Sequence, residues 1–194
     1  MPDQSPRAGR PRSEQARGAV LSACTELLRQ GGLRATTTDR IAALSGVSKA
    51  TIYKWWPNKY AVAVEAFLSR MYAESPDPDT GSSFEDFRLA VRGMMRFSAS
   101  PDGRIFAQLV AEAQNDPAVA AELRERLIAP RRALVRVIWD RGVARGELRE
   151  DVDPEVALDL LFGPTMYRLV AGHAPLDETA ADDIVRAALS GLAR

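Results

Sequence analysis

Hydrophobic residues recur every three or four positions over most of this chain, the spacing that places them on one face of an α-helix. The pattern therefore predicts an all-α fold. The expected helices span about 13–30, 38–44, 49–55, 58–74, 83–100, 105–115, 118–145, 154–172 and 177–192.

Capping residues and glycines predict where several of these helices begin and end. Ser13 is a suitable N-cap for the first helix, and Gly31-Gly32 ends it. Ser82 with Glu85 three positions later has the pattern of a capping box. Pro154 suits the first turn of the helix that it opens.

Other prolines and glycines predict interruptions. Segment 75–81 has the composition of a loop, and 101–103 should separate two helices. Pro130 lies inside the pattern 118–145, where proline removes a backbone hydrogen bond and clashes with the preceding turn. We therefore expect a kink or two abutting helices there. Segment 142–150 is charged and contains glycines, which predicts a loop.

The stretch from Thr37 to Lys59, TTDRIAALSGVSKATIYKWWPNK, has the layout of two short helices joined by a tight turn. Thr37 is expected to cap the first helix, with Ile41 and Leu44 turned inward. Gly46 supplies the positive φ that lets the chain reverse. Ser48 should cap the second helix, which buries Ile52 and presents hydrogen-bonding and cationic side chains of a kind that suits DNA.

The string SKATIYKWWPNK resembles the DNA-binding signature of the TetR family of bacterial transcriptional regulators, and the likeness extends from about Ser13 to Lys59. It implies that the helix from Lys49 to Trp55 enters the major groove, and that Tyr53 and Lys59 hold phosphates. Trp55 is a departure, because family members more often carry Tyr, Phe or His there; it can contact the DNA backbone or only pack. The candidate DNA contacts are Thr37, Lys49, Ala50, Thr51, Tyr53, Lys54, Trp55, Lys59 and Arg10.

The formal net charge of zero would argue against nucleic-acid binding if the charges were spread evenly. They are not, because residues 1–60 contain ten Lys or Arg and four Asp or Glu, a net charge of +6 that the remainder balances with −6. Residues 1–12 form a basic arm that is expected to be disordered. Its segment 9–11, Gly-Arg-Pro, can enter an A·T-rich minor groove through Arg10, or the arm can be a solubilising tail.

The chain lacks the parts of the common enzyme sites. It has one histidine, His173, no phosphate-binding glycine loop and no His/Cys cluster with metal-ligand spacing, so we expect no catalytic residue, no metal and no cofactor. His173 at a helix end is interpreted as a capping or interface residue. Cys24 is interpreted as a small buried core residue, with a redox sensor as the alternative.

The helices after residue 60 are expected to bind an effector and a second copy of the chain. A small apolar effector would lie among residues of the middle helices. The candidate pocket residues are Met94, Phe97, Phe106, Leu109, Trp139, Met166 and Tyr167. The helix 154–172 is apolar on nearly its whole circumference, so it needs partners on two sides. The resemblance implies that 154–172 and 177–192 form a four-helix dimer interface, which substitutions at Leu161 and Leu189 would test.

These observations predict a basic arm at 1–12, a helix-turn-helix DNA-binding domain at 13–60 and a helical effector-binding and dimerisation domain at 61–194. The expected function is that of a cytoplasmic, ligand-responsive transcriptional regulator, with repression as the expected direction of control. It would bind a near-palindromic double-stranded DNA operator as a homodimer. No segment approaches membrane-spanning length. The alternatives are a sequence-independent architectural DNA-binding protein and a helical small-molecule-binding protein.

Overall fold

The computed structural model describes residues 10–71 and 78–193, with the side chains of 13–68 and 78–193. In these ranges the chain is helical apart from its connections and one isolated bridge between Leu148 and Ala193. It divides into two compact units, Met1–Arg70 and Met71–Arg194, so the boundary follows residue 70 rather than residue 60. The difference arises because nearly all of the helix after the motif packs with the first unit.

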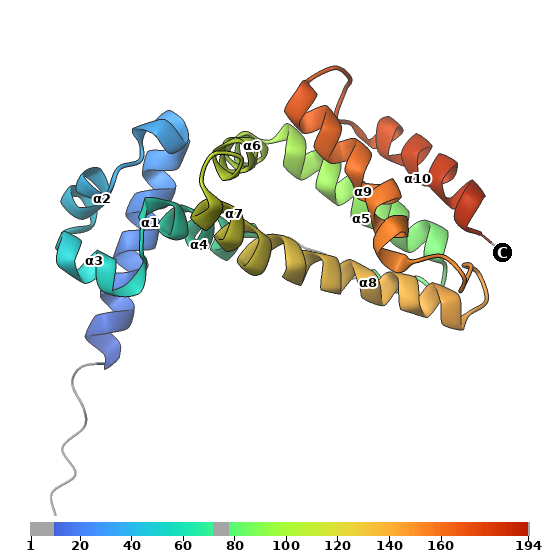
Figure 1. Ribbon diagram of the computed structural model, residues 1–194, viewed down its shortest axis with the longest axis horizontal. Coiled ribbons are helices and arrows are strands. Elements are labelled where there is room, and N and C mark those ends of the chain that lie inside the picture. The colour runs from blue at the N-terminus through green and yellow to red at the C-terminus, as the bar shows by residue number, and fades with distance from the viewer. Residues whose placement is uncertain (1–9, 72–77, 194) are drawn as a thin grey trace, which may run out of the picture. The chain divides into compact units, whose positions relative to one another are not determined.

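The helices of the first unit are α1 (Arg10–Ala35), α2 (Thr38–Ser45), α3 (Lys49–Trp55) and α4 (Lys59–Met71) (Figure 1). Helix α1 begins three residues before the predicted start, so residues 10–12 are helical rather than part of an irregular arm; residues 1–9 lie outside the described residues. Gly32 has φ 65° and ψ −167°, which is outside the helical region and ends the regular part of α1 as predicted. A core of apolar side chains, including Cys24, Ile41, Ile52 and Trp56, holds the helices together.

The second unit contains α5 (Ser83–Ala99), α6 (Pro101–Ala113), α7 (Pro117–Leu123), the π-helical turn η2 (Arg124–Ile128), α8 (Ala129–Ala144), α9 (Pro154–Ala171) and α10 (Glu178–Leu192). Helix α5 is central, because α8, α9 and α10 all pack against it (Figure 1). Their buried faces form one core that includes Phe87, Met95, Trp139 and Leu161. The N-cap expected at Ser82 is present, and Asp153 and Asp177 cap α9 and α10; each of the three side chains accepts a backbone hydrogen bond.

Two prolines show how the sequence shapes these helices. Residues 101–103 were expected to separate two helices, but Pro101 is already the first residue of α6. Ser100 caps this helix, and a proline in the first turn loses no hydrogen bond. Pro130 is accommodated by the wider turn η2, in which the Ala129 amide bonds to the carbonyl of Arg124. The irregularity predicted at Pro130, a kink or two abutting helices, takes the form of this π-helical turn between α7 and α8. Residues 75–77 of the predicted loop 75–81 lie outside the described residues.

Close approach between α5 and α8 depends on Gly142. A Cβ atom at this position would lie 2.2 Å from the Ser83 hydroxyl oxygen and 2.5 Å from the Leu148 side chain. Both neighbours are buried, so neither can move aside easily. Glycine therefore sets the distance between these helices.

Candidate nucleic-acid interface

The helix-turn-helix is built by two side-chain caps and one left-handed glycine. Thr37 caps α2 by accepting a hydrogen bond from the Arg40 amide, and Ser48 caps α3 by accepting one from Thr51. Gly46 has φ 69°, in the left-handed region where a side chain is strained, and its amide closes α2 on the Ala42 carbonyl. These features orient α3 with one face inward and the other toward solvent.

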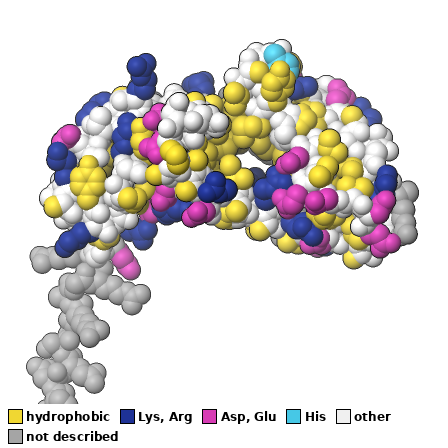
Figure 2. Space-filling model, in the orientation of Figure 1, with side chains coloured by type: hydrophobic (Ala, Val, Ile, Leu, Met, Phe, Trp, Pro, Cys, Tyr) yellow, Lys and Arg dark blue, Asp and Glu magenta, His cyan; other side chains and the backbone are white. Residues whose placement is uncertain are grey.

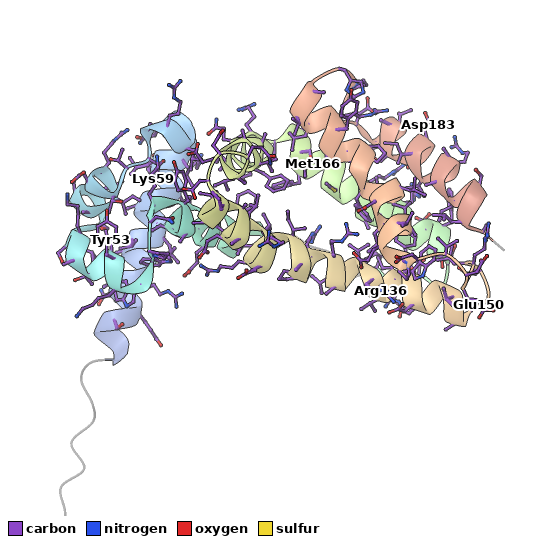
Figure 3. The ribbon with its side chains drawn as sticks, in the orientation of Figure 1. Tyr53, Lys59, Arg136, Glu150, Met166 and Asp183 are labelled. Carbon is purple, nitrogen blue, oxygen red and sulfur yellow. The ribbon has the colours of Figure 1, made fainter. Side chains whose placement is uncertain are left out.

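Burial separates the two faces of α3. Ile52 is buried against the rest of the first unit, whereas Lys49, Ala50, Tyr53 and Lys54 are exposed. Tyr53, labelled in Figure 3, has 53% of its surface exposed. Figure 2 shows Lys and Arg side chains at several points over α1–α3. A short helix with an exposed polar and cationic face is the arrangement by which a helix-turn-helix contacts a major groove.

Several candidate contacts have partners within the protein. The Thr51 hydroxyl lies 2.9 Å from that of Ser48, and the Lys49 ammonium lies 2.6 Å from the Asp39 carboxylate. Trp55 is half-buried and packs edge-on against Trp56, with ring centroids 5.5 Å apart. Trp55 therefore packs against another side chain of the protein, while part of its surface remains exposed.

The fold of both units agrees with the comparisons to known proteins. The pattern described as "Bacterial regulatory proteins, tetR family" matches residues 20–66, and that described as "Tetracyclin repressor-like, C-terminal domain" matches residues 77–188. The chain belongs to the TetR family. It is a DNA-binding transcriptional regulator with a helix-turn-helix domain.

Individual relatives match nearly the whole chain. The uncharacterized HTH-type transcriptional regulator YdeS of Bacillus subtilis is 42% identical over 95% of this chain and 93% of its own. The DNA-binding transcriptional repressor TetR of Mycobacteroides abscessus is 31% identical over 86% of this chain and 88% of its own. The crystal structure of TetR family transcription regulator SCO0332 has a TM-score of 0.81 at 35% identity, covering 91% of this chain and 98% of its own.

Lys59 is the first residue of α4. Its ammonium lies 3.4 Å from the Leu33 carbonyl near the end of α1 and 4.9 Å from the centroid of the Tyr60 ring. Lys59 thus ties α4 to α1 as well as carrying a charge. Arg10 is the first residue of α1, but its side chain lies outside the described residues, so the choice between a minor-groove arm and a solubilising tail stays open.

Two ion pairs within the first unit are not evident from the sequence. Nothing in the local pattern marks Asp39 as important, although the turn brings it beside Lys49. Glu65 on α4 accepts a hydrogen bond from the Trp56 indole at 2.9 Å and pairs with Arg17 on α1 at 2.7 Å. Both pairs join separate helices, so only the folded chain brings their members together.

The prediction that Leu44 points inward is wrong, since its side chain is 55% exposed. Positions 41 and 44 differ by about 60° around a helix, and α2 buries only the side that carries Ile41. The short helix α2 therefore contributes a single large apolar side chain to the core of the first unit.

The candidate pocket residues do not all share one surface. Phe97 and Phe106 contact each other across α5 and α6, with ring centroids 6.2 Å apart, and Leu109 is buried on α6. Met94 and Met166 are half-buried, and Met166 lies on the side of α9 toward α6 (Figure 3). Figure 2 shows a hollow in the second unit bounded by α6, α8 and α9, with hydrophobic side chains along its rim.

Two of the pocket predictions need correction. Tyr167 is 64% exposed and packs on His173, with ring centroids 4.6 Å apart, so it does not line an enclosed cavity of the protomer. Trp139 is fully buried in the core around α5, where it is packing rather than pocket wall. Sequence periodicity could not separate these cases, because both residues lie on helices with more than one apolar face.

Other chemical features of the described residues are simple. Burial raises the pKa of the Cys24 thiol to about 12, which keeps it protonated and unreactive and favours its interpretation as core. Within residues 10–71 and 78–193 no group of His, Cys, Asp and Glu could hold a metal ion. None of the described helices is both long and apolar enough to cross a membrane.

Proposed function

We propose that this TetR-family regulator is a ligand-responsive repressor, acting in the cytoplasm, that binds a near-palindromic operator as a homodimer. The observation that carries the DNA-binding part is the division of α3 into a buried side, with Ile52, and an exposed side, with Lys49, Ala50, Tyr53 and Lys54. Thr37, Thr51, Trp55 and Lys59 are the further proposed contacts of the first unit. The first unit is assigned to the operator, and the second to the effector and the partner subunit. The relative from Mycobacteroides abscessus is named a DNA-binding transcriptional repressor, which supports the proposed direction of regulation.

The homodimer is supported by an apolar stripe on α9. Val156, Leu160, Tyr167 and Val170 are exposed, and their spacing puts them on one side of the helix. Gly163 continues this stripe, and beyond its own helix no atom lies within 4 Å of the place that a Cβ atom would occupy. A row of exposed apolar side chains is typical of an interaction surface. We assign it to the partner subunit, with the exposed side of α10 completing the four-helix contact.

The effector is assigned to the hollow between α6, α8 and α9. Met94 and Phe97 of α5, Phe106 of α6 and Met166 of α9 are the proposed contacts, because methionine and aromatic side chains suit an apolar compound. A ligand there alters operator affinity only if it binds the DNA-competent and incompetent conformations unequally. A thermal-shift screen of apolar compounds tests this part: a compound that raises the melting temperature should also change DNA affinity. If no stabilising compound changes DNA affinity, the proposed regulation by an apolar effector fails.

Selection of bound sequences from a random DNA library tests the operator-binding part. A homodimer with two equivalent α3 helices should select an inverted repeat whose half-site centres lie about one helical turn, roughly 34 Å, or a multiple of it, apart. An architectural protein would select no consensus. That result would refute the proposed operator recognition.

A further inference from the structure

The first unit places a carboxylate beside one of its proposed DNA contacts. Asp39 lies in the first turn of α2 and Lys49 begins α3, and the turn at Gly46 brings their side chains together. The Lys49 ammonium is 2.6 Å from Asp39 Oδ1. Both side chains remain accessible, with 77% of Asp39 and 52% of Lys49 exposed, so DNA can compete for the lysine.

This ion pair changes how Lys49 can meet DNA. The hydrogen bond to Asp39 and the carboxylate charge raise the pKa of Lys49, which keeps the ammonium charged. A DNA phosphate that approaches this ammonium also approaches the carboxylate, and the two anions repel. The edge of a base is neutral, and the amino groups of cytosine and adenine can even donate to a carboxylate. The pair therefore disfavours phosphate contacts more than base contacts.

We propose that Asp39 is a selectivity-determining residue, which withholds Lys49 from phosphates and thereby lowers affinity for DNA of arbitrary sequence more than affinity for the operator. The inference rests on the proposed position of Lys49 at the DNA. Repulsion of wrong partners is a general route to specificity. It matters for a DNA-binding protein because nonspecific sites greatly outnumber operators.

The test compares Asp39→Asn with the wild-type protein on two duplexes, one of arbitrary sequence and one recovered by selection. The variant should bind the arbitrary duplex about two- to fivefold more tightly, the range expected when one exposed ion pair no longer competes. Its plot of log affinity against log salt should steepen by about 0.9, because Lys49 becomes available to one phosphate. Affinity for the selected duplex should rise less, so the specificity ratio falls.

Glu26→Gln is the matched control. Glu26 lies on α1, where it accepts a hydrogen bond from Gln30 and pairs with Arg29 at 3.8 Å, so its substitution removes the same charge without touching Lys49. Melting temperatures of all variants are compared to exclude unfolding. The inference is overturned if Asp39→Asn changes DNA affinity no more than Glu26→Gln does. It is also overturned if Asp39→Asn raises the affinity for both duplexes equally.

The variant Lys49→Ala separates this inference from the proposed function. In the Lys49→Ala background, Asp39→Asn should have little further effect, because there is no ammonium left to release. An equal tightening in both backgrounds would mean that Asp39 acts without Lys49, and would refute the inference. If Lys49→Ala alone leaves binding to both duplexes unchanged, Lys49 is not at the DNA, and that part of the proposed function fails too. If it weakens binding while Asp39→Asn does nothing, only the inference fails.

Discussion

Among single residues, Tyr53 and Lys59 are the proposed phosphate contacts, and they predict different responses to salt. Tyr53→Ala should weaken binding to all sequences about fivefold, the loss of one hydrogen bond, with an unchanged salt slope because the side chain is neutral. Lys59→Ala should also weaken binding generally but flatten the salt slope by about one. Fluorescence anisotropy titrations at several salt concentrations measure both. A change of base preference in either variant would contradict its role as a phosphate contact.

Lys59→Ala also removes the contact between Lys59 and the carboxyl-terminal end of α1, so it can change the position of α4 as well as the charge. Lys59→Arg keeps the charge and serves as the control for the salt slope. A flattened slope in Lys59→Arg would indicate that the geometry of α4, rather than the charge, governs binding.

Glu147 predicts a pH dependence of stability in the second unit. Hydrogen bonds from Ser83, and one from Arg145, lower the pKa of this carboxylate from 4.5 to about 2. A carboxylate with a depressed folded-state pKa stabilises the fold above its unfolded pKa, and this stabilisation is lost as the pH falls from about 4.5 toward 2. Glu147→Gln should therefore lower the melting temperature at pH 7 by about 2–4 °C and flatten its decline between these pH values.

The control for Glu147 is Glu150→Gln, an exposed acid near it in the sequence. The control should leave the acid-dependent part of the melting curve unchanged. An identical decline in wild type and Glu147→Gln would show that Glu147 does not carry the effect.

The caps of the helix-turn-helix could be predicted from the sequence, whereas the partners of its charges could not. Thr37 and Ser48 act as N-caps by bonding amides three positions along the chain, so the contact is set locally. The pairing of Lys49 with Asp39 depends on the angle of the turn between two helices. Side-chain partners of that kind require the fold to be known.

At the level of whole helices, α9 shows how neighbouring positions take opposite roles. Leu161 is fully buried in the core of the protomer, while Leu160 beside it is 51% exposed. Leu189 on α10 is also buried in that core. The expectation that substitutions at Leu161 and Leu189 would probe a dimer contact is therefore corrected, because such changes would disrupt folding. The face that can meet a partner is the exposed stripe containing Leu160.

The stripe predicts that Leu160→Glu gives a folded monomer. Placing a charge in an apolar subunit contact costs desolvation without a partner, whereas in the isolated protomer the same side chain is in water. Light scattering measures the mass, and circular dichroism measures the helix content. Leu44→Glu changes a similarly exposed leucine in the first unit and should stay dimeric. A dimeric Leu160→Glu protein would exclude this stripe as the interface.

For the molecule as a whole, the proposed regulation requires two copies of α3 to act on one operator. The half-site spacing is then a property of the dimer, so inserting about five base pairs, half a helical turn, into the selected sequence should abolish cooperative binding. Electrophoretic mobility shifts with the original and lengthened duplexes measure this. Equal affinity for the two duplexes would indicate that each α3 binds independently.

Local sequence patterns were enough to establish the all-α class, most helix ends and the helix-turn-helix, because apolar periodicity, caps and glycines act between residues close along the chain. They could not establish which apolar face of α9 enters the core, since both faces are hydrophobic and only packing against α5 distinguishes Leu161 from Leu160. The exposure of Tyr167 and Leu44 and the pairing of Asp39 with Lys49 likewise depend on how separate helices pack. The residues that surround these side chains belong to other segments of the chain, so the pattern within one helix does not reveal them.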